Sequence, residues 1–195
     1  GTFRFMNNSL NYGVDWFINE KNTLNFYGDY NYFASIFRDF NFDSRHYLND
    51  VLTGKEQILQ NNIEKGKSNY YSLYYKHKFE NPKKELVMQT GYYDYSGENN
   101  SSYNNIVLDV ETDEQIGSYY REDNIKNQRN SVDYKADFTQ GFDKSNLEAG
   151  IKSFYQWVNN KQQYSSDAVP TPFVYSEFRQ AAYINYSYKF EKVML

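Results

Sequence analysis

The stretch "LNYGVDWFINEKNTLNFYGDYNY" (residues 10–32) alternates apolar and polar side chains on both sides of the short polar segment "NEKN". A repeat of two residues is typical of a β-strand, and four residues are enough for a hairpin turn. The sequence therefore predicts an antiparallel hairpin with one apolar face. That face must lie against something, and the two candidates are a protein core and a lipid bilayer.

The composition favours an ordered chain with one wet surface and one apolar surface. Only 39% of the 195 residues are hydrophobic, and the mean hydropathy is -0.90. Polarity of this degree is typical of disorder, but disordered chains are poor in aromatic residues. Here aromatic residues make up 20% of the chain, with 22 Tyr and 15 Phe. We therefore expect a folded, strand-rich chain.

Charge and residue usage exclude several classes of site and partner. The net charge is -4, with acidic and basic residues interspersed, so no basic stripe predicts a nucleic-acid partner. The chain has no Cys, which excludes disulfides and Cys-ligated metals. No apolar run approaches the ~18 residues of a transmembrane helix, whereas a membrane-spanning strand needs only ~9–11 alternating residues.

The opening pattern recurs, and each recurrence pairs two alternating segments across a turn centred near residue 21, 82 or 143. Strands are expected near residues 9–18, 23–33, 68–79, 85–97, 131–139, 146–158 and 179–190, and "VML" at the end resembles the start of an eighth strand. The polar stretches that follow each pair are expected to be long loops, at residues 34–67, 98–130 and 159–178.

Short turns that alternate with long loops favour an antiparallel up-and-down transmembrane β-barrel, with the turns periplasmic and the loops extracellular. A soluble antiparallel sheet with one solvated face alternates in the same way, but loops beyond ~12–15 residues are uncommon in compact domains. We therefore expect residues 1–195 to form part of one barrel domain.

The alternation assigns each strand residue to one of two faces. The side chains expected to face lipid are Leu10, Tyr12, Val14, Trp16, Ile18, Leu24, Phe26, Tyr30, Tyr32, Tyr71, Leu73, Tyr75, Phe79, Leu86, Met88, Val132, Tyr134, Ala136, Phe138, Leu147, Ala149, Ile151, Tyr155, Trp157, Ala182, Ile184, Tyr186, Tyr188 and Phe190. Those expected to face a wet lumen are Asp15, Asp29, Asn31, Asp133, Lys135, Asp137, Glu148, Lys152 and Asn185.

The strand segments resemble a known family. In order, "LNYGVDWFINEKNTLNFYGDYNY", "SLYYKHKFE", "SVDYKADFT", "LEAGIKS" and "QAAYINYSYKF" resemble consecutive strands of the Bacteroidetes outer membrane protein β-barrel family, whose members are similar to TonB-dependent receptors. The resemblance covers nearly all strand segments and fails in the loops.

The resemblance implies a barrel of about twenty-two strands with an N-terminal plug and a segment that contacts TonB. Neither plug nor TonB segment is recognisable here, and seven strands cannot close such a barrel, so we expect an internal portion of a longer chain. The expected partners are outer membrane lipid, the remainder of the barrel and plug, TonB through the parent chain, and a surface lipoprotein; no cofactor is expected.

The resemblance therefore implies that the chain forms the wall and outer loops of an importer of a nutrient ligand in the bacterial outer membrane. A non-transporting barrel that serves as an assembly, secretion or docking accessory is the first alternative. A soluble β-sheet binding module is the second. No nucleophile elbow or phosphate-binding glycine loop is present, and the two His are isolated, so we expect no enzyme.

Three groups of residues in the expected loops have a functional interpretation beside a plainer one. Two acidic runs could bind calcium, but they lack EF-hand spacing, and solvated loops are favoured: Asp39, Asp43 and Asp50, and Asp109, Glu111 and Asp113. Residues 51–63 have partly helical spacing, although simple loop folding is favoured. Five loop tyrosines could stack on sugars or peptides or pack among the loops: Tyr47, Tyr103, Tyr119, Tyr120 and Tyr164.

Overall fold

The described residues form one sheet of seven antiparallel strands in sequence order, each strand paired with the next. The computed structural model describes residues 1–165 and 172–190. The strands are β1 (Thr2–Asn19), β2 (Asn22–Leu48), β3 (Val51–Lys78), β4 (Lys84–Leu108), β5 (Gln115–Gly141), β6 (Ser145–Tyr164) and β7 (Phe173–Tyr188). This is the up-and-down order that the sequence predicts. The expected eighth strand lies outside the described residues.

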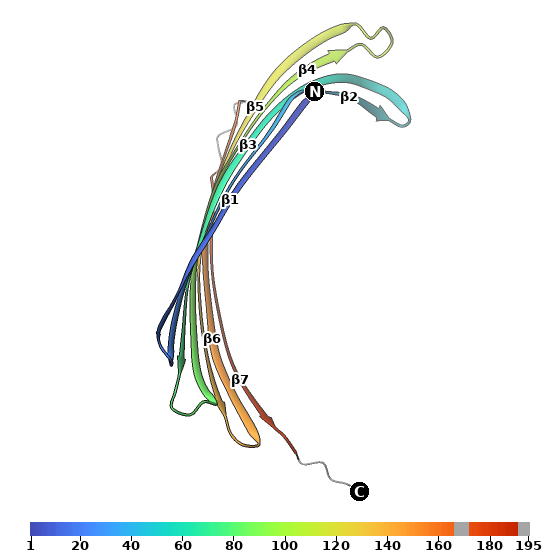
Figure 1. Cartoon of the computed structure of the whole chain (residues 1–195). Helices are drawn as coiled ribbons and strands as arrows, with labels where there is room; N and C mark the ends of the chain where they lie inside the picture. The colour runs from blue at the N-terminus through green and yellow to red at the C-terminus, as the bar shows by residue number, and fades with distance from the viewer. Residues whose placement is uncertain (166–171, 191–195) are drawn as a thin grey trace.

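The sheet is a curved wall, and the tips of the β2–β3 and β4–β5 hairpins bend toward its concave side (Figure 1). Strands β2 and β3 have 27 and 28 residues, which at 3.3 Å per residue gives a length of about 90 Å. Strands β1 and β7 are the two edges of the sheet. No described helix is long and apolar enough to cross a membrane.

The expected long loops at residues 34–67 and 98–130 are wrong, whereas the centre of the third, at residues 159–178, lies outside the described residues. Most of residues 34–67 and 98–130 continue the strands on either side and pair across two long hairpins. The segment with partly helical spacing lies in β3 and not in a helix. The polar composition of these stretches suggested loops, but a strand that is wetted on both faces does not need an apolar face.

Two local signals explain how the outer hairpins form. Asn49 and Asp50 connect β2 to β3 with φ angles of 49° and 64°, and after glycine Asn and Asp are the residues that most readily adopt this left-handed region in two-residue hairpin turns. Lower in β2, a bulge between Phe37 and Phe40 contains Asp39 at φ 55°, and the Asp39 N–H donates to Asn61 Oδ1 over 3.0 Å. A bulge bends its strand, as this one does where the hairpin curves.

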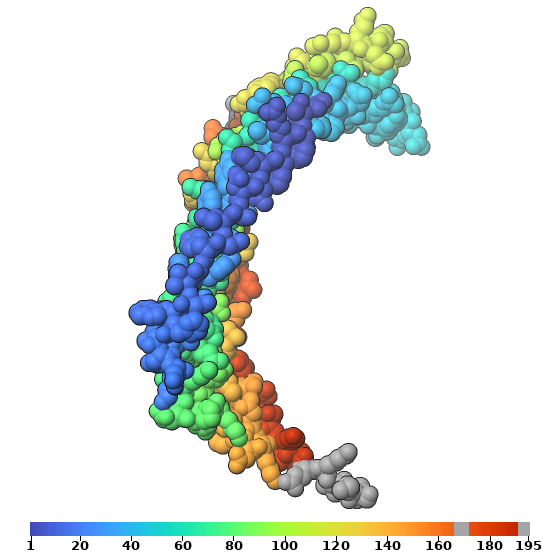
Figure 2. All heavy atoms as spheres, viewed as in Figure 1, coloured from blue at the N-terminus to red at the C-terminus, as the bar shows by residue number. Residues whose placement is uncertain are grey.

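The wall is one layer thick and has no core of its own (Figure 2). Its accessible surface is 14088 Å², whereas a compact monomer of 23.3 kDa would expose about 9,700 Å². Among the described residues, Ala34 is the one buried apolar side chain, and no large side chain is fully buried. The apolar residues must therefore be covered by something other than the described part of the chain.

Candidate functional site

The two faces of the sheet are the functional surfaces of this chain, and the strand register sorts the residues between them. Residues that pair directly across strands point to the same side of a sheet. One row runs through all seven strands as Trp16, Leu24, Tyr75, Met88, Ala136, Ile151 and Ala182. A second runs through Tyr12, Gly28, Tyr71, Tyr92, Val132, Tyr155 and Phe178. The sequence-derived apolar series thus share a single surface, the apolar face.

The opposite surface, the mixed face, contains the residues that the sequence predicts for a lumen. Asp15 lies in a row with Asn25, Tyr74, Gln89, Lys135 and Lys152. Tyrosines and phenylalanines lie between these polar groups, so this face is aromatic as well as charged. It differs from the apolar face in carrying every mid-strand ion that the sequence singled out.

Solvent exposure is inverted between the two faces. On β3, Leu73 of the apolar face is 43% exposed and Tyr71 is 36% exposed, whereas Ser72 of the mixed face, between them, is 6% exposed. The side chain of Asp137 on the mixed face is only 17% exposed. In a water-soluble protein large apolar side chains are mostly covered, so the exposed side chains of the apolar face need a cover that the described residues do not provide.

The mixed face compensates its shielded charges by short polar networks. Lys135 Nζ lies 2.6 Å from Asp137 Oδ2, and the Tyr183 hydroxyl donates to Asp137 Oδ1 over 2.8 Å. On the first hairpin, Asn25 Nδ2 donates to Asp15 Oδ1 over 2.5 Å. A half-buried carboxylate is stable only when such partners replace water. The networks therefore fix the mixed face in one arrangement.

A cavity of about 610 Å³ opens on the mixed face of β5–β7, and Arg129, Lys152 and Arg179 line it. The Arg179 guanidinium lies 5.4 Å from the centre of the Phe154 ring and pairs with Glu177. Arg129 donates to Gln156 Oε1 over 3.2 Å. The prediction included Lys152 but missed both arginines. Arg129 fell in the expected loop at residues 98–130, and the face assignment of the expected strand at residues 179–190 began only at Ala182.

Aromatic rings of the sheet lie over glycines of the neighbouring strand. A Cβ atom at Gly28 would lie 2.3 Å from the Tyr12 ring, and one at Gly150 would lie 2.4 Å from the Tyr183 ring. Glycine leaves the space that these rings fill, and the rings in turn shield the exposed backbone of the glycine. Pairs of this kind occur on both faces and fix the register between the strands.

The acidic runs that suggested calcium do not converge. No group of three or more His, Asp and Glu among the described residues is arranged to hold a metal. Asp109 instead accepts the N–H groups of Glu111 and Thr112, each over 2.9 Å, and these donors lower the pKa of its carboxyl. Asp113 pairs with Lys55 over 2.6 Å. These carboxylates therefore shape the outer turn of the β4–β5 hairpin.

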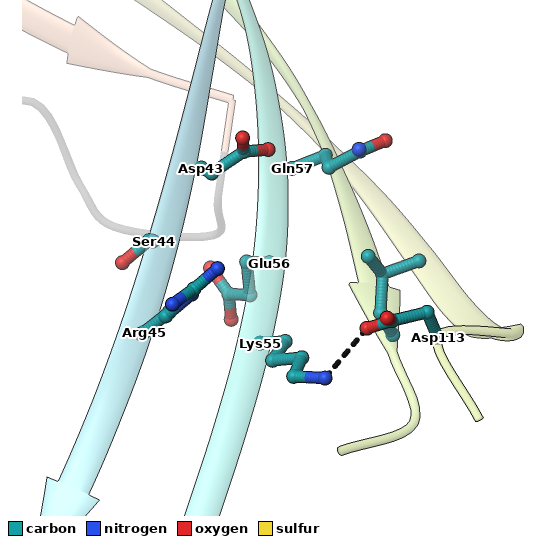
Figure 3. A pocket seen from close by; sticks show the side chains of 8 residues that line it. Asp43, Ser44, Arg45, Lys55, Glu56, Gln57 and Asp113 are labelled. Carbon is teal, nitrogen blue, oxygen red and sulfur yellow. Dashed lines mark hydrogen bonds and ion pairs between the residues drawn. The ribbon is translucent and has the colours of Figure 1, made fainter. Parts of the chain in front are cut away.

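The Lys55–Asp113 pair borders a pocket at the outer tips of the two long hairpins (Figure 3). Its volume is about 330 Å³, and its lining is polar: Asp43, Ser44, Arg45, Lys55, Glu56, Gln57, Leu108 and Asp113. Acidic and basic groups alternate around it. This mixture favours internal ion pairing over the capture of a strongly charged ligand.

The outer tyrosines contact neighbouring groups of the sheet. Arg121 lies 4.3 Å over the Tyr103 ring, Tyr119 donates to Glu56 over 3.5 Å, and Tyr164 donates to Gln162 over 2.8 Å. Tyr47 is 60% exposed at the hairpin tip. Tyr119 and Tyr120 are 50% and 59% exposed, so the contacts cover only part of these rings.

The opposite rim, with the short turns, has its own pattern of contacts. Lys21 pairs with Glu80 of the next turn, and Lys83 pairs with Asp143 of the turn after that, over 3.1 Å. Lys84 Nζ lies 4.5 Å from the centre of the Phe79 ring. His77 contacts that same ring at 4.6 Å between ring centres, so the ring sits between two polar groups at the end of the apolar face.

Comparison with known proteins agrees with this architecture. The model of a family described as "Outer membrane protein beta-barrel family" matches residues 77–195. Among curated proteins, none matches the sequence. The residues matched by the family model, 77–195, include β4 to β7 and the last two residues of β3.

Two solved structures share the fold. The ferric yersiniabactin uptake receptor FyuA from Yersinia pestis matches 93% of this chain with 11% identity and a TM-score of 0.61. The ferric citrate transporter FecA, in its unliganded form, matches 97% of this chain with 11% identity and a TM-score of 0.53. The chain spans 25% of the first and 26% of the second.

Proposed function

Because the chain belongs to the outer membrane protein β-barrel family, we propose that it forms part of the wall and outer hairpins of a TonB-dependent importer of a nutrient ligand. The family and the fold place it in the bacterial outer membrane as a β-barrel. The matched family and structures are outer membrane barrels, receptors or transporters rather than enzymes. Beyond this, we propose that the protein imports a ligand, that import depends on TonB, and that the ligand is a nutrient.

The observation that carries the proposal is the uncovered apolar face. Its side chains run from Leu10 to Ile18 on β1 and from Leu147 to Trp157 on β6. Each span matches the ~9–11 residues that a tilted strand uses to cross the hydrocarbon layer. We assign this face to lipid, and the mixed face to the barrel interior.

The two edges of the sheet are part of the same proposal. Strands β1 and β7 each have one side without a described partner strand, and unpaired backbone groups cost several kcal/mol each in hydrocarbon. Further strands of the parent barrel pair with both edges in the membrane. The similarity to about a quarter of each neighbouring receptor supports this arrangement.

In the proposed mechanism the wall itself is passive. The outer hairpins β2–β3 and β4–β5 extend beyond the membrane and take part in capturing the ligand, while the mixed face holds a plug through its ions and aromatic rings. Energised movement of the plug then opens the passage. The importer function draws on the two neighbours, named for ferric yersiniabactin uptake and ferric citrate transport, and no particular cargo follows from it.

Deletion of the parent gene tests the proposal. The deletion strain and a strain lacking TonB are grown on a panel of single limiting nutrients. The proposal predicts one nutrient on which both strains fail, with growth of the deletion strain restored by the full-length gene. Normal growth on every nutrient, together with loss of a surface protein from the deletion strain, would contradict import and favour a docking accessory.

A further inference from the structure

Four exposed lysines lie on the outward side of the sheet just beyond the apolar face. The row that follows Met6 and Ala34 continues as Lys65, Glu98, Lys126 and Lys161 across β3 to β6. The fourth lysine, Lys67, lies two residues from Lys65 on the same side of β3. We call Lys65, Lys67, Lys126 and Lys161 the lysine belt.

The place of the belt on the sheet follows from the register. Lys126 and Lys161 are in the alternation of Val132 and Tyr155, so both point to the apolar side. Between the lysines and this apolar pair lie two rows, Gln128 with Asn159 and Asn130 with Trp157. The belt therefore begins where hydrocarbon ends, on the side of the long outer hairpins.

Lys126 and Lys161 are also directly opposite one another on neighbouring strands. Like charges in this position destabilise a sheet. Glu98 opposes Lys126 from β4. On the other side of β6, the pairing with β7 ends at Asn160 and Phe173, so no described residue of β7 pairs with Lys161. A cavity of about 450 Å³ lies here, and its lining is Asn124, Lys126, Lys161, Gln162, Gln163 and Pro172. Ammonium and amide donors around one cavity provide for an anion.

We propose that the lysine belt, with Lys126 and Lys161 at its centre, binds the phosphate group of an anionic lipid in the outer leaflet. This inference rests on the proposed function in one respect, the assignment of the apolar face to lipid. The phosphate of such a lipid, placed between the two ammonium groups, removes their repulsion. The acyl chains of the same lipid lie on the apolar face. Basic side chains at a membrane surface attract such headgroups.

Glu98 lies in the same row as Lys65 and Lys126, and its negative charge opposes the binding of a phosphate there. Its carboxylate accepts from Asn124 over 3.5 Å. Side-chain hydrogen bonds from Asn100 and Asn124, together with the charges of Lys126 and Lys65, hold the pKa of Glu98 low. The belt thus contains one fixed negative charge. Removal of that charge by Glu98→Gln should strengthen phosphate binding rather than weaken it.

The test uses the full-length protein that contains this chain, purified in a neutral detergent. Native mass spectrometry measures the affinity for phosphatidic acid, whose headgroup is a phosphate monoester, and for phosphatidylcholine. We expect a loss of roughly fivefold per lysine in K126Q and K161Q, and a gain in E98Q. Lys152→Gln is the matched control, because it removes a lysine from the mixed face of the same strand.

Two further measurements complete the test: lipid binding by a charge-reversal variant at Lys161, and competition between the lipid and inorganic phosphate. Lys161→Glu places opposite charges across β5 and β6, so this variant should fold at least as well as the wild type and still lose the lipid. Equal affinity of the wild type and the K126Q/K161Q variant for phosphatidic acid would overturn the proposal, as would a similar loss in K152Q. Full displacement of lipid by inorganic phosphate would show an anion site without lipid specificity and would overturn it as well.

The same experiment separates failure of this inference from failure of the membrane assignment. If the purified protein stays monodisperse without detergent and binds neither lipid, the apolar face does not meet a bilayer and the proposed function fails. If the protein needs detergent but its lipid binding ignores the belt, only the further inference fails.

Discussion

The two faces of the same seven strands differ more than any two strands do. On the apolar face most side chains are uncharged, many large ones are exposed, and few of them bond to each other. On the mixed face several ions have a named partner, such as Lys135 with Asp137 and Lys76 with Glu85 at 2.7 Å. One face carries mainly apolar side chains with few polar contacts, and the other carries ions and polar groups that contact one another. The two faces differ because successive side chains along each strand point to opposite sides of the sheet, so each position belongs to one face only.

The largest expected effect comes from a charge placed in the middle of the apolar face. Leu73→Arg should destabilise the full-length protein by about 2–4 kcal/mol, the cost of a basic side chain at the bilayer midplane. The neighbouring Tyr74→Arg is the control, since its side chain points to the mixed face. Equilibrium unfolding from vesicles measures both, and equal losses would remove the distinction between the faces.

A methyl group at Gly150 should have the next largest effect. The new Cβ would lie 2.4 Å from the Tyr183 ring and 2.6 Å from Asp137 Oδ1, so Gly150→Ala separates the hydrogen-bonded pair on the mixed face. We expect a loss of about 1–3 kcal/mol, the cost of leaving a buried polar group unpaired. Gly117→Ala serves as control, because its nearest neighbour would be 3.9 Å away. Equal losses of unfolding free energy in Gly150→Ala and Gly117→Ala would contradict the importance of the space at Gly150.

Removal of a single hydroxyl isolates one contact of the same network. Tyr183→Phe keeps the ring over Gly150 and deletes the hydrogen bond to Asp137. A typical hydrogen bond contributes about 0.5–1.5 kcal/mol, so a loss within that range is expected in unfolding experiments. A loss as large as that of Gly150→Ala would mean that the hydroxyl, and not the ring, holds the strands in register.

The smallest effects belong to the rim of short turns. Lys21 bonds to Glu80 and lowers the pKa of its carboxyl, so any stabilisation from this pair is present at neutral pH. It is lost only as the pH falls through the depressed pKa, below 4.5. Since the Glu80 side chain is 91% exposed, Glu80→Gln should leave the melting temperature unchanged at pH 7. A clear drop would show that the turns lock the wall.

Periodicity was sufficient to predict the membrane part of the sheet. The alternation of residues 10–32 gave the first hairpin, and the same reasoning predicted the strand order and the composition of both faces, because a buried apolar face demands strict alternation. Where neither face is apolar that demand disappears, and the alternation is lost. The strands at residues 34–67 and 98–130 were therefore expected to be loops.

Better signals for these outer strands were present in the sequence. Asn49-Asp50 is a pair suited to a two-residue turn, and it lies at the middle of the stretch that was expected to be a loop. The lysine belt was missed for the same reason, because Lys65 and Lys126 have a face only once their stretches are strands. Arg129 and Arg179 line one cavity only because β5, β6 and β7 pair side by side. No local sequence pattern predicts that arrangement.

The most direct test of the account measures which side of β3 meets lipid. Single spin labels at positions 71 to 75 of the full-length protein in vesicles report collision rates with oxygen, which concentrates in hydrocarbon, and with a water-soluble nickel chelate. The account predicts high oxygen accessibility at positions 71, 73 and 75 and low oxygen accessibility at 72 and 74. Uniform accessibility along the strand, or the opposite phase, would contradict the assignment of the apolar face to the bilayer.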